Sequence, residues 1–446
     1  MKFVEILTLS HPSLCCLRNF STSEPEWYDR NRAMSSRLGY LFGIFLVGII
    51  CFFAHYFSES MFFFILHNKF CSENTLVWSC FSIQMIYRIS FAMTCYHFIM
   101  MVISCVNVAA VNRWADFCWI LKVMTAFGFF FIACVMPNGF FKAWGFVCMI
   151  VSVIAFPIKI AYMIDSLRFF ASSDPITPRR KCPMGVGIGF GVLFFILGLG
   201  IFILIFVWEH DHLRCTAHLV TAIIMCVAAF VIFFIFAASS IVAKQGGAML
   251  AGGMFFFAIA VGEWGLTAAT SHSPCKNVLN VNVTYEKAVS GLEILFNLFF
   301  LIPGFIFLGR VDLSEYFHHS QGSFSVLAPL HVLLQVNLVA PRTTAYPATY
   351  NSALLGYQKA ANLLQPIFNR QGNQGLFHFL CMAFSCYIGM ACNSWIQPLF
   401  YKFTPIDILT RDLLWIRFSS LCLACVFAFF SALLSFIRKP RGINLR

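Results

Sequence analysis

Residues 184–208 read MGVGIGFGVLFFILGLGIFILIFVW, and this stretch decides the fold class of the chain. It holds no charged side chain and no proline, and it exceeds the ~20 apolar residues that an α-helix needs to cross a bilayer. Its hydrophobicity does not alternate from residue to residue, as that of a barrel strand would. Because a helix satisfies its own backbone hydrogen bonds in lipid, the stretch predicts a transmembrane helix.

The rest of the chain has the same character. Of its 446 residues, 60% are apolar and 11% are charged, whereas a soluble domain carries about 25% charged residues. This composition excludes a soluble globular, a disordered or a fibrous protein. The sequence predicts an all-α integral membrane protein with ten transmembrane helices. The ten apolar runs are Leu38–Phe57, Ile89–Val111, Ile120–Met136, Phe140–Ser166, Met184–Trp208, Leu219–Val242, Ala248–Ala269, Ala288–Leu308, Leu376–Ile396 and Leu413–Ile437.

These runs divide the chain into five segments. They are a cytoplasmic N-terminal segment (1–37), eight helices (38–308), a cytoplasmic loop (309–374), two helices (375–437) and a basic cytoplasmic tail (438–446). In the loop, the apolar run Val326–Val339 is too short to span a bilayer and predicts an interfacial helix.

The fourth run is unusually long. It continues from Phe140 past Ser166 toward Ala171, with Pro157 inside. At 1.5 Å per residue it would measure ~45 Å, against a hydrocarbon core of ~30 Å. We therefore expect it to tilt or kink and to join two halves of the molecule.

Positive charge gives the orientation. Most of the 30 Lys and Arg residues lie on the side that holds both termini, so both termini are predicted to be cytoplasmic. The basic residues that give the net charge of +12 are spread over the segments between the predicted spans rather than gathered in one domain. No nucleic-acid partner is therefore expected. The first 37 residues lack a compact apolar core, so no cleaved signal is expected either. The sequon at Asn282 falls in a loop predicted to lie outside, which makes Asn282 a glycosylation candidate.

Cysteine and histidine positions raise two further candidates. Most of the 19 Cys residues lie inside predicted spans and are interpreted as small packing residues. Predicted outside loops hold Cys71, Cys80, Cys215 and Cys275, which are disulfide candidates with three pairings open. The spacing of His210, His212, Cys215 and His218 resembles a zinc site, but a solvated loop with a disulfide-bonded Cys215 is the favoured interpretation. No cofactor is therefore expected.

Charged residues inside spans carry the most information, because each is costly there unless it is paired or hydrated. Lys122, Lys159 and Asp165 lie toward the cytoplasmic side, and Glu263 and Glu293 toward the outer side. Lys122 and Asp165 are predicted to pair between the third and fourth helices. The five residues either line a lipid path or form buried ion pairs. His97 and His378, also within spans, are interpreted as packing residues.

The glycine-rich stretches allow three interpretations: a nucleotide-binding site, close helix packing or a break in a helix. The fifth helix opens with Gly185, Gly187, Gly189 and Gly191. No strand precedes them, so they favour close helix packing over a dinucleotide site. Gly246-Gly247 and Gly252-Gly253 are interpreted as helix breaks near the cytoplasmic end. No phosphate-binding loop is present, so the chain is not expected to be an enzyme or an ATP-driven pump.

A series of short motifs resembles the serine incorporator (Serinc) family. In chain order they are Ser35–Tyr40, Tyr87–Met93, Pro137–Phe140 with Trp144, Ile164-Asp165, Cys275, Phe377–Phe379, Trp395 and Trp415–Ser420. The resemblance implies ten helices in two bundles bridged by the long tilted fourth helix. It also implies that Lys122 and Asp165 occupy family positions. The chain departs from the family pattern at Ser166–Phe170, in its basic eighth loop and in a reduced Cys pair at Cys15-Cys16.

The resemblance and the buried charges together predict function. Family members aid serine entry into phosphatidylserine and sphingolipids, or scramble phospholipids without ATP. We expect ATP-independent scrambling or transbilayer transport of phosphatidylserine-type lipids. The alternatives are a serine carrier or scaffold for lipid-synthesis enzymes, and a transporter of small polar solutes. Expected partners are membrane lipids, then serine or lipid-synthesis enzymes and a second copy of the chain. The expected location is the secretory pathway, the plasma membrane or the vacuole.

Overall fold

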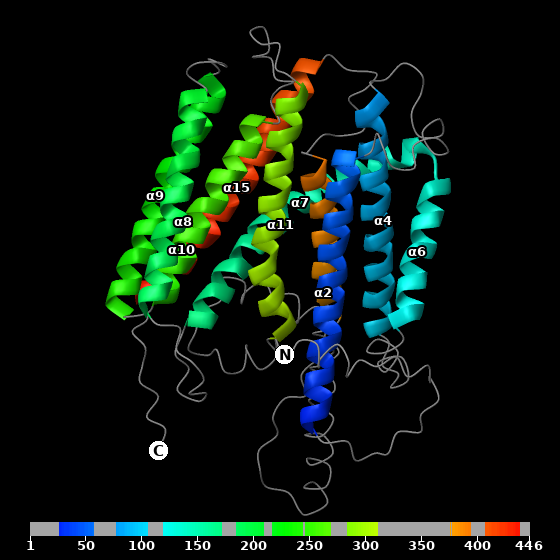
Figure 1. Cartoon of the computed structure of the whole chain (residues 1–446), viewed down its shortest axis with the longest axis horizontal. Helices are drawn as coiled ribbons and strands as arrows, with labels where there is room; N and C mark the ends of the chain where they lie inside the picture. The colour runs from blue at the N-terminus through cyan, green and yellow to red at the C-terminus, as the bar shows by residue number, and fades with distance from the viewer. Residues whose placement is uncertain are drawn as a thin grey trace, which may run out of the picture.

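The computed structural model describes residues 26–57, 77–105, 119–171, 184–208, 216–243, 246–268, 283–310, 375, 377–393 and 406–437. All regular structure within these residues is α-helical (Figure 1). The helices are α2 (Glu26–Phe57), α4 (Val77–Cys105), α6 (Trp119–Val135), α7 (Asn138–Ala171), α8 (Met184–Trp208), α9 (Thr216–Ala243), α10 (Gly246–Ala268), α11 (Val283–Arg310) and α15 (Ile406–Ile437). A further apolar helix covers Phe377–Cys392.

The helices confirm an integral membrane protein. Seven contain a segment long and apolar enough to cross a bilayer, and three more apolar segments are shorter. The long segments are Ser36–His55, Phe81–Ser104, Asn138–Leu167, Gly185–Val207, Thr216–Val242, Gly246–Leu266 and Leu414–Leu433. The shorter ones are Trp119–Val135, Gly291–Phe305 and Phe377–Cys392. Each of the ten predicted runs coincides with one of these segments or overlaps it.

The second predicted run is placed wrongly at its start. The helix α4 begins at Val77 rather than Ile89, and its described residues extend to Cys105. The predicted run leaves out Arg88, because a charged side chain within a span is costly unless it is paired. In the structure Arg88 is buried inside α4, so the helix continues through it. Cys80 consequently lies in α4 and not in an outside loop.

The helix α7 runs obliquely across the molecule, behind α11 and α2 in Figure 1. It is 34 residues long, and it continues through Pro157. Proline has no backbone N–H, so the carbonyl of Val153 four residues earlier loses its helical donor. The Ser420 hydroxyl on α15 donates a hydrogen bond of 3.1 Å to that carbonyl. A side chain from another helix thus compensates for the proline.

Buried apolar side chains form two clusters, and α7 contributes to both. One cluster is built mainly on α7, α8, α9, α10 and α15. The other is built mainly on α2, α4, α11 and the Phe377–Cys392 helix. On α7, Ile160 and Ile164 belong to the first cluster, and Ile158 and Tyr162 to the second. The oblique helix therefore presents one face to each cluster.

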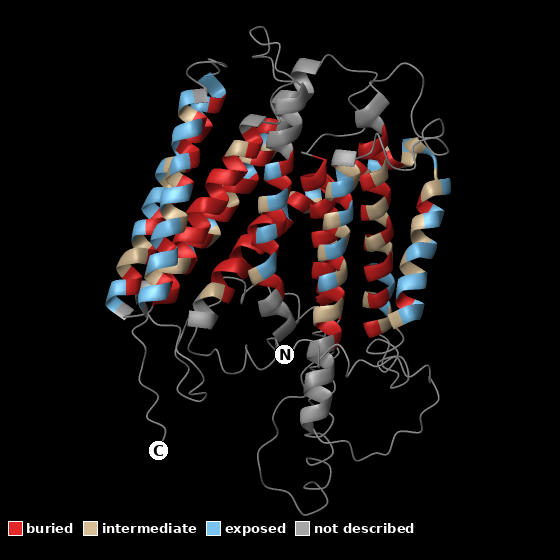
Figure 2. Ribbon diagram, viewed as in Figure 1, coloured by how far each residue is buried: buried red, intermediate tan, exposed pale blue. Residues whose placement is uncertain are grey.

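Exposure follows the position of each helix. The helix α10 is mostly buried, whereas α8 and α9 carry many exposed apolar side chains (Figure 2). In a bilayer such exposed residues face lipid tails. Lipid tails are as apolar as the side chains, so helix association depends on packing and polar contacts rather than on the hydrophobic effect.

Glycine lets α8 and α10 approach closely. A Cβ on Gly191 would lie 2.6 Å from the carbonyl oxygen of Met249, and one on Gly187 would lie 2.8 Å from that of Gly246. These contacts support the packing interpretation for Gly187 and Gly191, whereas the neighbouring Gly185 and Gly189 face open space. The break predicted at Gly252-Gly253 is wrong. Both residues lie inside the continuous helix α10, where a Cβ on either would meet a neighbouring helix.

Several predicted features lie outside the described residues. They are the interfacial helix at 326–339, the termini at 1–25 and 438–446, Cys71, Cys215, Cys275, Asn282, His210 and His212.

Candidate functional site: a buried polar cluster

A polar cluster lies inside the helical region where α7, α10, α11, α15 and the Phe377–Cys392 helix meet. Its first half surrounds Lys159 on α7, which is 2% exposed. The Lys159 ammonium donates hydrogen bonds to Asn297 Oδ1 at 3.0 Å and to the Tyr387 hydroxyl oxygen at 2.7 Å. The Tyr387 hydroxyl donates in turn to Asn297 Oδ1 at 2.7 Å. Lys159 also lies over the rings of Phe156 and Tyr387, each 4.6 Å from Nζ.

The second half is an ion pair between α15 and α11. Arg417 Nη2 lies 2.6 Å from Glu293 Oε1, and both side chains are buried. Arg417 Nη1 also donates to the carbonyl of Gly265 on α10 at 2.7 Å. A Cβ at Gly265 would collide with the Glu293 carboxylate, so a larger residue there would displace Glu293 from its present position. Arg417 lies within the predicted run Leu413–Ile437, but no partner for it was predicted from the sequence.

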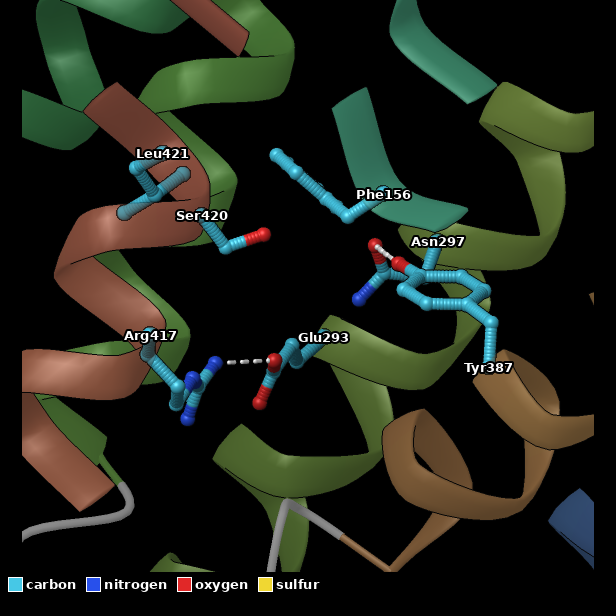
Figure 3. Close-up of a pocket in the computed structure, with 8 residues that line it drawn as sticks. Phe156, Glu293, Asn297, Tyr387, Arg417, Ser420 and Leu421 are labelled. Carbon is cyan, nitrogen blue, oxygen red and sulfur yellow. Dashed lines mark hydrogen bonds and ion pairs between the residues drawn. The ribbon is translucent and has the colours of Figure 1, made fainter. Parts of the chain in front are cut away.

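A small cavity separates the two halves (Figure 3). It is lined by Phe156, Gly262, Glu293, Asn297, Tyr387, Arg417, Ser420 and Leu421. The space open to the centre of a water-sized sphere is about 20 Å³, which is enough for about one water molecule. Glu293 Oε2 is buried and has no hydrogen-bond partner in the structure. The cavity therefore has room for a hydrogen-bonding guest and an acceptor to receive it.

The cluster holds two basic side chains, Lys159 and Arg417, and one acidic side chain, Glu293, which interacts electrostatically with both. An excess of positive charge in a low-dielectric site attracts an anionic group such as a phosphate or a carboxylate. The single carboxylate could receive an ammonium group. The cluster thus carries the complementary charges for a headgroup or amino acid that bears both signs.

One lipid-facing helix separates this cluster from the surface. On α11, Glu293 and Asn297 are buried, whereas Leu292, Leu295 and Phe299 are exposed. The helices α11 and α15 share few direct contacts, so the Arg417–Glu293 pair bridges a seam between them. We use the name α11–α15 seam for this junction.

Glu263 and Glu293 belong to different surroundings. Glu263 lies on α10 and accepts a hydrogen bond of 2.9 Å from the Thr221 hydroxyl on α9. Glu293, on α11, packs against Gly265, which follows Glu263 by two positions on α10. Positions two apart on a helix point about 200° from each other. The two glutamates share a predicted depth. In the structure, however, Glu263 projects from one face of α10, and Glu293 of α11 packs against another face of α10.

Lys122 and Asp165 are both buried, on α6 and α7. Lys122 Nζ lies 4.7 Å from the ring centroid of Tyr40 and 4.4 Å from that of Trp119. The helix α6 packs against α4 and shares few contacts with α7. The premise that the third and fourth helices are closely packed neighbours is therefore wrong, and the Lys122–Asp165 pair stays a prediction.

Two other sequence-based assignments can be compared with the structure. His218 was placed in a loop with metal-like spacing, but it lies in the first turn of α9 and is buried. The second predicted run starts at Ile89 and so leaves Arg88 outside it. In the structure Arg88 donates hydrogen bonds of 2.7 Å to both Gln84 Oε1 and Asn138 Oδ1, next to the turn between α6 and α7.

A family model described as serine incorporator (Serinc) matches residues 13–309. The chain belongs to the Serinc family. The match confirms the family that the sequence motifs resemble. A search of curated proteins finds no match to the chain. Within the Serinc match lie Lys159, Glu293 and Asn297, whereas Tyr387 and Arg417 lie beyond its end. The polar cluster therefore combines the matched segment with the last two helices.

Proposed function

We propose that this Serinc protein moves phospholipids of the phosphatidylserine type between leaflets without ATP. The observation that carries the proposal is the buried cluster of two basic side chains and one acidic side chain, covered by a single lipid-facing helix. A headgroup would cross the membrane along the α11–α15 seam while its tails remain in lipid. The phosphate would interact with Lys159 and Arg417, and the serine ammonium with Glu293.

The proposed architecture has ten crossing helices in two bundles bridged by α7. The two apolar clusters and the oblique course of α7 support this arrangement. Both termini would be cytoplasmic, and the membrane would belong to the secretory pathway, the cell surface or the vacuole. Membrane lipids would be the partners, and the protein would not act as an enzyme.

The test is reconstitution of the purified protein into liposomes with a fluorescent lipid in both leaflets. Dithionite added outside quenches the outer leaflet alone unless lipids exchange. We expect nearly complete quenching with the wild-type protein and quenching of about half in protein-free liposomes. Quenching of about half by folded, monodisperse protein would reject scrambling. Serine uptake or stimulation of lipid synthesis by that protein would then favour the carrier or scaffold alternative.

A further inference from the structure

Two histidines and a cysteine from distant parts of the chain meet in the second apolar cluster. His97 lies on α4, and His378 and Cys381 lie on the Phe377–Cys392 helix, shown in orange in Figure 1. The ligand atoms of the three residues all lie within 4.8 Å of one another. Their exposed fractions are 0%, 2% and 1%, respectively. His378 and Cys381 are three residues apart, so they share one helix face.

The two imidazoles are spaced as ligands of one metal ion would be. Their Nδ1 atoms are 3.3 Å apart. This is long for an N–H···O or N–H···N hydrogen bond, for which about 2.9–3.0 Å is usual. With metal–nitrogen bonds of about 2.0–2.1 Å, two ligands at the tetrahedral angle stand about 3.3–3.4 Å apart. The observed spacing therefore fits a shared ion.

The protein alone does not satisfy these groups. His97 Nε2 is buried and has no hydrogen-bond partner in the structure. A direct hydrogen bond between the two Nδ1 atoms would leave that nitrogen unsatisfied in either tautomer. Cys381 is a free thiol at the same place. An ion bound by the two Nδ1 atoms would leave Nε2 unchanged, so the unpartnered nitrogen shows only that no hydrogen bond at Nε2 fixes the tautomer of His97.

Charge near the cluster selects among metals. Lys122 and Arg37 both interact electrostatically with His378. The Tyr40 ring is close to both His378 and Lys122: its centroid lies 4.8 Å from the centroid of the His378 ring and 4.7 Å from Lys122 Nζ. A divalent ion with one thiolate would add a net positive charge beside two cations. A monovalent ion with one thiolate adds none, which costs less in an apolar interior.

Ligand softness is compatible with the same ion. A thiolate with imidazoles beside it suits both copper and zinc, and the charge argument favours the monovalent ion of the two, copper. Met100 lies three residues from His97 on α4 and belongs to the same apolar cluster as Cys381. Sites with two His, one Cys and a weak methionine ligand are established copper sites.

We propose that His97, His378 and Cys381 bind one monovalent copper ion. The ion would join α4 to the Phe377–Cys392 helix. Its role would be to fix these two elements against each other, independently of any lipid path at the α11–α15 seam.

The test uses the full-length protein in detergent, titrated with monovalent copper under ascorbate against a chromophoric copper chelator. We expect one equivalent bound by the wild-type protein. Loss of even an outer-shell partner typically weakens a metal by about 10–100-fold, so Cys381→Ser should lose at least that much affinity. His97→Gln and His378→Gln should do the same. Cys425→Ser, at a buried cysteine of the other apolar cluster, is the matched control and should bind as the wild type does.

Two further measurements guard against misfolded variants. Copper should raise the thermal unfolding midpoint of the wild type and of Cys425→Ser, but not that of His378→Gln. X-ray absorption of the copper-loaded protein should show both sulfur and nitrogen ligands. The proposal is overturned if the wild type holds no stoichiometric copper, or if Cys381→Ser and His378→Gln bind it equally well. Stoichiometric zinc binding without copper binding would overturn the assignment of the ion.

Discussion

At the scale of single residues, the buried charges matter most because each must find a partner away from water. Lys159 contacts an amide, a phenol and two aromatic rings. Arg417 contacts a carboxylate and a backbone carbonyl. Neither arrangement is readable from one sequence, because the partners come from other helices. What could be predicted was the position of Lys159 and Glu293 inside spans and the cost of leaving them unpaired.

The Arg417–Glu293 pair gives a stability prediction. Removing one partner of a buried pair typically costs about 3–5 kcal/mol, because the other charge stays buried. Arg417→Met should therefore sharply lower the yield of monodisperse protein and its thermal midpoint in detergent. Arg417→Met/Glu293→Leu should recover part of both. If the double variant is no better than the single one, the pair is not what stabilises this junction.

Lys159 gives a prediction about activity. A unit charge 4 Å from a phosphate contributes roughly 4 kcal/mol at an effective dielectric of 20, and about 1.4 kcal/mol is a factor of ten in rate. Lys159→Met should slow scrambling of phosphatidylserine by at least about tenfold, and that of phosphatidylcholine less. Lys142→Met removes the same charge near the other end of α7 and should leave both rates unchanged. Equal rates for Lys159→Met and wild type would remove Lys159 from the path.

At the scale of helices, the sequence predicted where apolar segments lie better than where they end. The start of α4 was missed because a charge such as that of Arg88 is costly within a span unless it is paired, whereas Gln84 and Asn138 satisfy it inside. Gly252-Gly253 looked like a break, but the space beside α10 is filled by other helices. His97 and His378 could not be paired from sequence, since 281 positions separate them. In each case a contact between helices overrides the local pattern.

Pro157 and Ser420 should be thermodynamically coupled. Ser420→Ala removes the donor to the Val153 carbonyl that Pro157 leaves free, and a hydrogen bond of this kind contributes about 1 kcal/mol. In a Pro157→Ala background the α7 backbone can supply its own donor, so Ser420→Ala should then cost little. A double-mutant cycle of unfolding in detergent measures this coupling. Additive costs would show that the two residues act independently.

The α8–α10 contact should be sensitive to single methyl groups. Gly191→Ala would push a Cβ onto the backbone of α10, and overpacking of this kind typically costs about 1–3 kcal/mol. Gly189→Ala, at a neighbouring position that faces open space, is the matched control and should be neutral. The thermal unfolding midpoints of the two variants, each compared with that of the wild type, test this prediction. A stable Gly191→Ala protein would mean that α8 can move away from α10 without loss.

At the scale of the whole molecule, two places could let a headgroup pass on the outer side. One is the α11–α15 seam at Glu293, and the other is the α9–α10 contact at Glu263. The helices α9 and α10 pack closely along their length, whereas α11 and α15 are joined mainly through Arg417 and Glu293. The seam has less packing between its two helices than the α9–α10 contact has, so the proposed lipid path follows the seam.

Neutral substitutions distinguish these two paths. Glu293→Gln removes the carboxylate that is proposed to receive the serine ammonium, so scrambling of phosphatidylserine should become slower. Glu263→Gln keeps an oxygen that can accept the Thr221 hydrogen bond, and it lies on the other face of α10, so its rate should equal that of the wild type. Both variants are measured by dithionite quenching after matching for monodisperse protein. A rate change in Glu263→Gln alone would move the path to α9 and α10, and unchanged rates in both would exclude the two glutamates from it.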